Sequence, residues 1–261
     1  MSGATGPLLT EEQRAKLAQR LAMRSRDRSD VGQALPMTAA ALAVGAADDC
    51  GAARLEALVE ALGSERVIVP VPVEADPRVA GVHANADPDR FDIDFVRVDA
   101  AAGPALAVYT CAESLAADRP GDRPMALEAR RACLAALVET SGRLLVDPAG
   151  AAVLVPRPAT AALAQGDRWL PAWRDAELAS ELRRLAGVGG AGGGPVTDVR
   201  VRYAGEGTTR VEIEVDPDYP RADARVEVDA AVRAVGASPR LAAAADRIEL
   251  TPVRAERRKA R

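Results

Sequence analysis

Few side chains in this sequence could serve as catalysts or metal ligands. The 261 residues include one histidine, His83, and three cysteines, Cys50, Cys111 and Cys133, which form no C-x-x-C pair. An odd number of widely spaced thiols predicts neither a disulfide framework nor a zinc ribbon, so we expect them to be small buried apolar side chains. Cys111 is the first candidate for a nucleophile, because it follows a predicted strand and could begin a helix, where a thiol pKa is lowered.

The acidic residues near His83 are a second candidate site. Asp87, Asp89, Asp92 and Asp94 alternate with other residues, but no D-x-D register places the glycine and the glutamate where an EF-hand needs them. Asp92 and Asp94 would share one face of a strand, which is typical of a half-exposed strand. We interpret the cluster as a solvated face, with a metal or partner-recognition role as the alternative.

A glycine-rich segment, residues 187–192, spells the G-x-G-x-x-G pattern of dinucleotide-binding proteins. That pattern holds a pyrophosphate only where a strand precedes it and a helix follows it. Here a predicted helix precedes the segment, and Pro195 with a strand follows, so we interpret it as a linker. The sequence also contains no G-x-S-x-G elbow, P-loop or H-E-x-x-H motif. We therefore expect a non-catalytic protein with no cofactor and no catalytic or metal-binding residues.

The elements that would position these side chains begin after an N-terminal region of 51 residues. Residues 10–13 form a capping box, and Leu17 and Leu21 follow at helical spacing, which predicts a helix over residues 10–26. The small-residue stretch over residues 29–50 indicates a flexible tail or linker.

An α+β domain with a mixed sheet is predicted over residues 52–174. The helix predicted over residues 127–140 offers Leu127, Ala132, Leu134, Leu137 and Val138 to a core. The other expected elements are helices near 52–62 and 158–166, strands near 67–73, 93–98 and 105–110, and a hairpin of two short strands over 144–155, turning at Asp147-Pro148-Ala149-Gly150.

A smaller domain is predicted over residues 175–253, followed by a basic tail, residues 254–261. Its element order is α-β-β-α-β, which suits a small sheet with helices on one face. The tail can contact phosphate or an acidic partner, although charged termini usually stay solvated.

Composition restricts the partners that we expect. With 34 basic and 38 acidic side chains the formal net charge is −4, which argues against a general nucleic-acid binder. No run of about 18 apolar residues predicts a membrane span. The first ten residues lack the basic start and long apolar run of a secretory signal. A cytoplasmic protein without membrane or nucleic-acid contacts is expected, and its oligomeric state is open.

The chain resembles the SseB-like family, named for enhanced serine sensitivity, over residues 52–173. The collinear pieces are Leu55–Leu58, Val67–Val71, Ala105–Thr110 with Glu113-Ser114-Leu115, Glu128–Arg131, Leu145–Gly150, Leu154–Pro158 and Ala164–Gly166. Tyr109 and Cys111 replace a phenylalanine and a serine that are common in the family. Residues 175–253 look like the C-terminal domain of some members. The resemblance implies a soluble α+β protein with no established enzymatic activity and no agreed cofactor.

These observations favour a protein that acts through contacts with another protein. The alternatives are a regulator that binds a small molecule related to amino acids, and an enzyme that uses Cys111. A binding module predicts a shallow apolar patch, whereas a metabolite sensor predicts an enclosed pocket with convergent polar groups. The predicted contact surface comprises Glu113, Ser114, Glu128, Arg130, Arg131, Asp147 and Gly150.

Overall fold

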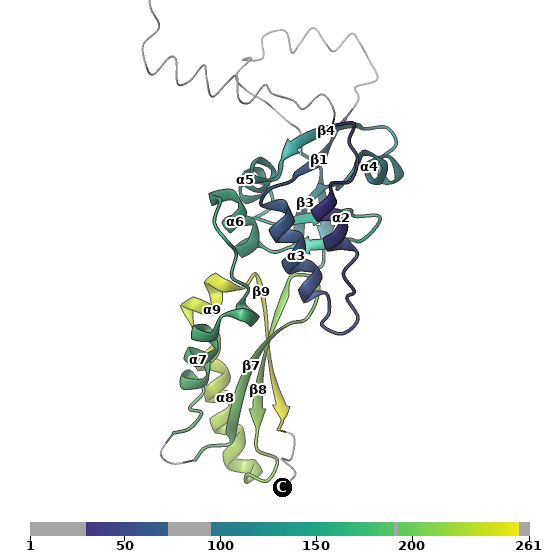
Figure 1. Ribbon diagram of the computed structural model, residues 1–261. Coiled ribbons are helices and arrows are strands. Elements are labelled where there is room, and N and C mark those ends of the chain that lie inside the picture. Colours follow the sequence, from purple (N-terminus) through teal and green to yellow (C-terminus); the bar gives the residue numbers. More distant parts are fainter. Residues whose placement is uncertain (1–29, 73–94, 191–192, 256–261) are drawn as a thin grey trace, which may run out of the picture.

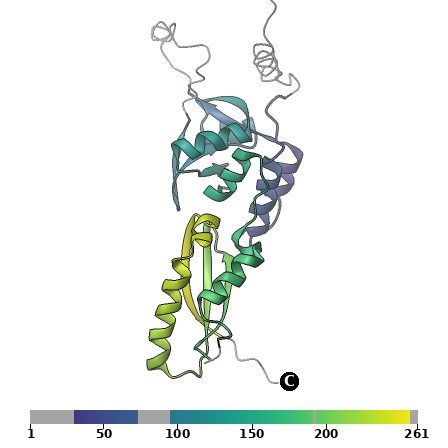
Figure 2. The ribbon, with the colours of Figure 1, turned by 90° about the vertical axis from the view of Figure 1, so that its left-hand side faces the viewer.

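The chain has the predicted α+β fold, and its two hydrophobic cores lie in two parts that Figures 1 and 2 show stacked end to end; we call these parts the first and the second domain. The computed structural model describes residues 30–72, 95–190 and 193–255. The helix predicted over residues 10–26, His83, the acidic cluster at 87–94 and the end of the basic tail lie outside the described residues.

The first domain places short helices around two small sheets. Most of its elements match the predicted ones within a few residues. In the described residues they are α2 (Pro36–Leu42), α3 (Ala52–Leu62), β1 (Arg66–Val71), β2 (Arg97–Ala100), β3 (Gly103–Val108), α4 (Ala112–Asp118), β4 (Arg123–Glu128), α5 (Ala129–Glu139), β5 (Leu144–Val146), β6 (Val153–Val155), α6 (Arg157–Gln165) and the 3₁₀ helix η3 (Ala172–Arg174).

The larger sheet of this domain has the strand order β2-β3-β5-β6. β3 runs parallel to β5 and the other two pairs are antiparallel, so the sheet is mixed. β1 pairs antiparallel with β4 and is bridged to β3 at Ile68 and Tyr109. Pro70 of β1 lies opposite Pro124 of β4. The prolines predict an edge strand or a strand end, because proline has no N–H to donate, and β1 and β4 form a sheet of only two strands.

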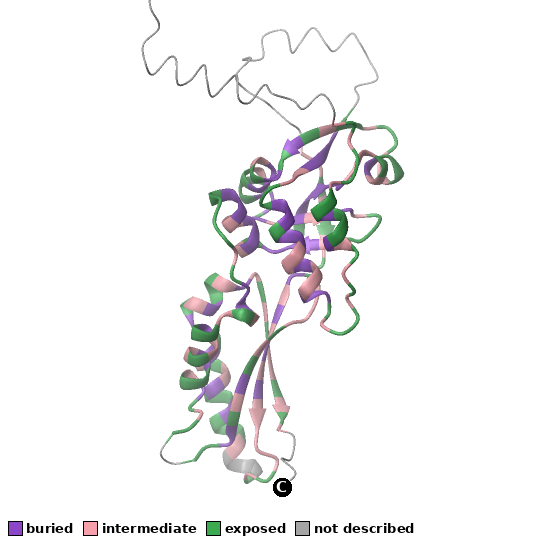
Figure 3. Cartoon of the chain, in the orientation of Figure 1, coloured by how far each residue is buried: buried purple, intermediate pink, exposed green. Residues whose placement is uncertain are grey.

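Helix α3 shows how the sequence builds the first core. Leu55, Leu58 and Leu62 are at most 3% exposed, and their spacing is that of one helix face. Burying each leucine contributes about 1.5–3 kcal/mol to the stability of the fold. Figure 3 shows that buried residues line the sides of α3, α5 and α6 that meet the strands.

The second domain has the predicted order, with one short helix added. Strand β8 lies between β7, which is antiparallel to it, and β9, which is parallel to it. The helices cover one face of this sheet, the side nearest the viewer in Figure 2. The elements are α7 (Ala176–Leu185), β7 (Val196–Tyr203), β8 (Thr208–Val215), α8 (Arg221–Gly236), the additional α9 (Pro239–Ala244) and β9 (Arg247–Arg254).

The structure differs from the predicted flexible tail over residues 30–51. Helix α2 lies in this segment and contacts α3, and Thr38 is 2% exposed. Glu65, which follows α3, accepts hydrogen bonds from the Met37 N–H at 2.9 Å and from the Thr38 N–H and hydroxyl at 2.8 and 2.6 Å. The first domain therefore includes residues 30–51. No local pattern reveals this, because Glu65 lies 27 residues beyond Thr38 in the sequence.

Strand β4 is a second difference, because the sequence pattern did not predict it. Leu127 is the one buried residue among the six of β4, so no alternation of apolar side chains marks the strand. Its pairing with β1 provides the order that its own side chains do not specify.

A buried ion pair connects the two domains. Two guanidinium nitrogens of Arg143 each lie 2.7 Å from a carboxylate oxygen of Asp246, and these side chains are 17% and 2% exposed. Elsewhere at the junction the rings of Trp173 and Tyr203 lie 5.0 Å apart, and the Trp173 indole N–H donates to Glu56 at 2.6 Å. These contacts fix η3 against α3 and so shape the groove between them.

Candidate functional site

Asp147, one of the predicted surface residues, lies inside the protein. It is 6% exposed, and its carboxylate accepts hydrogen bonds from the Thr110 N–H at 2.9 Å and the Thr110 hydroxyl at 2.7 Å. Its φ of 49° is left-handed, a conformation that aspartate adopts more readily than most residues. The side chain therefore ties the β5–β6 turn to the end of β3 and cannot contact a partner. Gly150, in the same turn, is exposed as expected.

Glu113 and Ser114 lie in the first turn of α4. Glu113 is exposed, whereas Ser114 is partly buried and forms hydrogen bonds with Cys111. The Cys111 sulfur accepts a hydrogen bond from the Ser114 N–H at 3.4 Å and lies 3.2 Å from the Ser114 oxygen. This contact caps the helix, a structural role that accounts for both side chains.

Tyr109 anchors the other end of α4. The ring is 1% exposed, and its hydroxyl donates to Asp118 at 2.6 Å. Burial and this hydrogen bond both raise the pKa of the Tyr109 hydroxyl. The hydroxyl of Tyr109 therefore adds a hydrogen bond between the residue that follows β3 and the end of α4.

Glu128 and Arg130 lie at the junction of β4 and α5, on the same side of the domain as Asp30. Both are exposed, and the Arg130 guanidinium donates to the Ala164 carbonyl at 2.9 Å. Glu128 lies opposite Arg66 in the strand register. Arg66 pairs with Asp30 at 2.6 Å, and the hydrogen bond from its guanidinium holds the pKa of Asp30 below its ordinary value of 3.8.

The predicted surface residues thus form two groups. Glu113, Ser114 and Gly150 lie near the ends of β3 and β5, and Glu128, Arg130 and Arg131 lie at the start of α5. Arg66 links the groups, since it also donates to the Thr110 carbonyl at 3.1 Å.

Helix α5 presents an apolar surface that the sequence analysis assigned to the core. Leu134, Leu137 and Val138 are 50%, 37% and 82% exposed, which corrects the prediction for these three residues. The buried face carries Ala129, Ala132, Cys133 and Ala136, all at most 2% exposed. The spacing i, i+3, i+4, i+7 of these small residues was the available signal. Small side chains let the helix approach the sheet closely, and the larger apolar ones then face outward.

We call this outward surface, formed by Arg131, Leu134, Leu137 and Val138, the α5 face. Arg97 and Glu139 form an exposed ion pair at 3.8 Å beside its C-terminal end. The apolar residues are thus bordered by charged ones, an arrangement common at protein–protein contacts.

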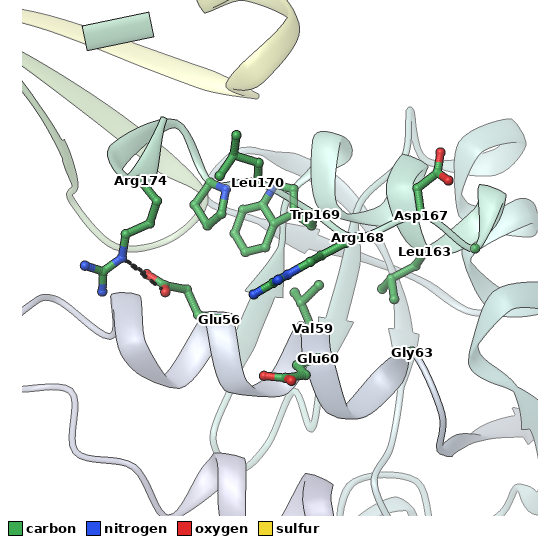
Figure 4. A pocket seen from close by; sticks show the side chains of 12 residues that line it. Glu56, Val59, Glu60, Gly63, Leu163, Asp167, Arg168, Trp169, Leu170 and Arg174 are labelled. Carbon is green, nitrogen blue, oxygen red and sulfur yellow. Dashed lines mark hydrogen bonds and ion pairs between the residues drawn. The ribbon is translucent and has the colours of Figure 1, made fainter. Parts of the chain in front are cut away.

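A half-open groove of about 890 Å³ lies between α3 and the segment that follows α6. Figure 4 shows Glu56, Val59 and Glu60 of α3 along one side, with Trp169, Leu170 and Arg174 along the other. The groove is only partly enclosed, whereas a metabolite sensor is expected to have an enclosed pocket.

The two tryptophans stiffen the wall of this groove. The rings of Trp169 and Trp173 are 5.5 Å apart and meet edge to face at 83°. Glu56 accepts the Trp173 N–H and pairs with Arg174 at 3.1 Å. The Trp169 indole nitrogen is buried without a hydrogen-bond partner among the described residues. An aromatic wall held in this way is a preorganised contact surface.

The cysteines occupy three different environments. Cys133 is fully buried, and burial raises the pKa of its thiol to about 12, which agrees with the predicted apolar role. Cys111 is partly buried, and Cys50 is exposed, which corrects the prediction for that residue. Within the described ranges, no three metal-ligating side chains gather into a metal site.

The fold and these surfaces define a two-domain α+β protein with an exposed apolar helix face and a half-open groove. Every helix in the described part of the chain is too short or too polar to cross a bilayer. Residues 39–162 match the family model described as the SseB protein N-terminal domain, and the first domain of the chain belongs to this family. The match begins within α2 and ends within α6. No curated protein and no solved structure matched the chain.

Proposed function

We propose that this SseB-like protein is a non-catalytic binding module that contacts a partner protein through the α5 face. The observation that carries the proposal is the exposure of Leu134, Leu137 and Val138 at i, i+3 and i+4 on one helix. Single exposed apolar residues are ordinary, but a contiguous group with a charged border is typical of an interaction surface. We place this contact in the cytoplasm, the location predicted from the sequence.

The chemistry of the face defines the partner that fits it. The two leucines and the valine offer an apolar strip that is a little over one helical turn long, and Arg131 continues it toward the helix start. A partner surface with apolar side chains over that strip fits best. Full burial of each such side chain contributes about 1.5–3 kcal/mol, so this face can anchor a transient complex.

The test compares Val138→Asp with Val226→Asp. Val226 lies on α8 of the second domain and is 69% exposed, so it matches Val138 in residue type, exposure and helical setting. Each protein is used for affinity capture from native-cell extract, followed by mass spectrometry and by a binding titration with the captured partner. We expect a partner that wild type and Val226→Asp retain and Val138→Asp loses. Absence of a reproducible partner, or equal retention by both variants, refutes the proposal.

Binding of a small molecule related to amino acids is the second candidate function. The specific observation is the volume of the groove, about 890 Å³, which falls within the usual range of ligand sites. Arg168 and Glu60 would supply opposite charges for an amino-acid zwitterion. A thermal-shift screen against amino acids tests this, and a flat screen rejects it.

A further inference from the structure

The groove beside α3 continues into a second hollow of about 570 Å³ that reaches the start of the described chain. Its lining includes Asp30 and Leu35 together with Glu128 and Arg130. Gly63 lines both hollows. Arg130 of the second hollow also lies close to Gly166 of the first. A Cβ atom built on Gly166 would be 3.8 Å from the Arg130 guanidinium. We call the two hollows together the α3 groove.

The α3 groove carries excess negative charge around an apolar floor. Its lining includes six carboxylates and four guanidinium groups. Glu60, Asp167 and Glu128 are exposed, and their carboxylates form no hydrogen bond or ion pair with another described residue. Val59 and Leu163 contribute the floor, with Trp169 beside them. Such a surface suits a basic segment that carries apolar side chains on one face.

The chain itself contains a segment with this chemistry. Residues 10–26, over which the sequence predicts a helix, include five basic and two acidic side chains. Leu17 and Leu21 lie at i, i+4 and would share one face of that helix. The charge of the segment is therefore opposite to that of the groove, and its apolar pair corresponds to the groove floor.

Chain connectivity also favours this occupant. From Leu21 the predicted helix continues for five residues to Arg26, and four more residues lead to Asp30, so this stretch spans up to about 20 Å. The part of α3 that lines the groove, from Glu56 to Gly63, covers only about 10 Å. Asp30 itself lines the groove, so the C-terminal end of the segment is joined to the groove by a short linker. For a linker of this length the effective local concentration of the segment is in the millimolar range.

We propose that residues 10–26 bind the α3 groove of the same chain, with Leu17 and Leu21 on its apolar floor and the basic residues beside its free carboxylates. The segment covers the wall formed by Trp169. It thereby acts as an internal ligand that any external ligand of this groove must displace. The inference concerns a surface other than the α5 face, and it stands or falls independently of the proposed partner contact.

The two tryptophans of the chain report directly on this contact. Trp169 lines the groove and Trp173 packs against it, so tryptophan emission measures whether the groove is covered. The full chain is compared with the full-length double variant Leu17→Asp/Leu21→Asp. We expect a red shift of the emission maximum and a loss of protection from acrylamide quenching in that variant. Far-UV circular dichroism and the urea midpoint confirm that the folded domains remain.

The matched control is Ala15→Asp/Gln19→Asp, which adds the same number of charges at the same spacing on the opposite side of the predicted helix. It should keep the quenching protection of wild type. The groove-side variant Glu60→Arg/Asp167→Arg changes two exposed residues, and it should lose protection. Equal quenching of wild type and Leu17→Asp/Leu21→Asp overturns the proposal, and so does equal loss in the control. Protection that grows with protein concentration also overturns it, because it identifies the occupant as the segment of a second copy.

Discussion

Replacing Asp246 by alanine should lower the free energy of unfolding by removing the ion pair between the two domains, while the hydrophobic core of each domain stays intact. The side chain of Asp246 is 2% exposed and accepts two hydrogen bonds from the Arg143 guanidinium at 2.7 Å, with the Arg157 N–H at 3.4 Å as a further donor. Removing one partner of a buried ion pair costs about 3–5 kcal/mol, since the other charge stays buried. Arg143 retains 17% exposure and can regain some hydration, so we expect about 3 kcal/mol.

The assay is urea unfolding followed by tryptophan emission, because both tryptophans lie close to the domain junction. Glu249→Ala is the control: it removes a carboxylate that pairs with Arg210 at 3.0 Å, in a pair 43% and 49% exposed. That change should cost less than about 1 kcal/mol. The double variant Arg143→Met/Asp246→Leu should recover most of the stability lost by Asp246→Ala, because it leaves no unpaired charge. Similar small losses in Asp246→Ala and Glu249→Ala would refute the reasoning.

Three further predictions test other parts of the structure. Ala136→Leu should destabilise the fold by about 1–3 kcal/mol through overpacking, whereas Val138→Asp should change stability by less than about 0.5 kcal/mol. Urea unfolding measures both changes, and a larger effect of Val138→Asp would place that side chain in the core. The hydrogen bond from the Arg66 guanidinium lowers the pKa of Asp30, so the stability that this carboxylate contributes is present above pH 4 and is lost as the pH falls through its folded-state pKa. Asp30→Asn should therefore flatten the acid limb of the stability–pH profile, and an unchanged limb contradicts the assignment. In native protein, Cys50 should react at once with a thiol reagent while Cys133 reacts only on unfolding, and fast labelling of Cys133 would contradict its burial.

The agreement between sequence and structure is best where neighbouring residues carry the whole signal. The leucines of α3 and the alternating strands β7 and β8 define their buried faces by spacing alone. The β5–β6 hairpin follows from its turn residues, and it forms between residues 144 and 155 as expected. Strand β4 could not be predicted from local spacing, because Leu127 is the one side chain that it buries.

The candidate surfaces show the opposite case. The region around α4 and the start of α5 could be selected from the sequence, but the roles of its side chains could not. Asp147 looks like an exposed turn residue until Thr110, from another strand, is placed beside it. The groove could not be predicted at all, because it combines α3 with residues more than a hundred positions further along the chain.

The sequence by itself determined the α+β class, the order of most elements and the scarcity of groups able to do chemistry, because composition and local spacing carry this information. Only the tertiary structure decided which face of α5 points inward. Its larger side chains suggest one face and its alanines another, and the close approach to the sheet selects the alanines. Tertiary contacts likewise brought residues 30–51 into the first domain, since the carboxylate of Glu65 that holds α2 is remote in sequence.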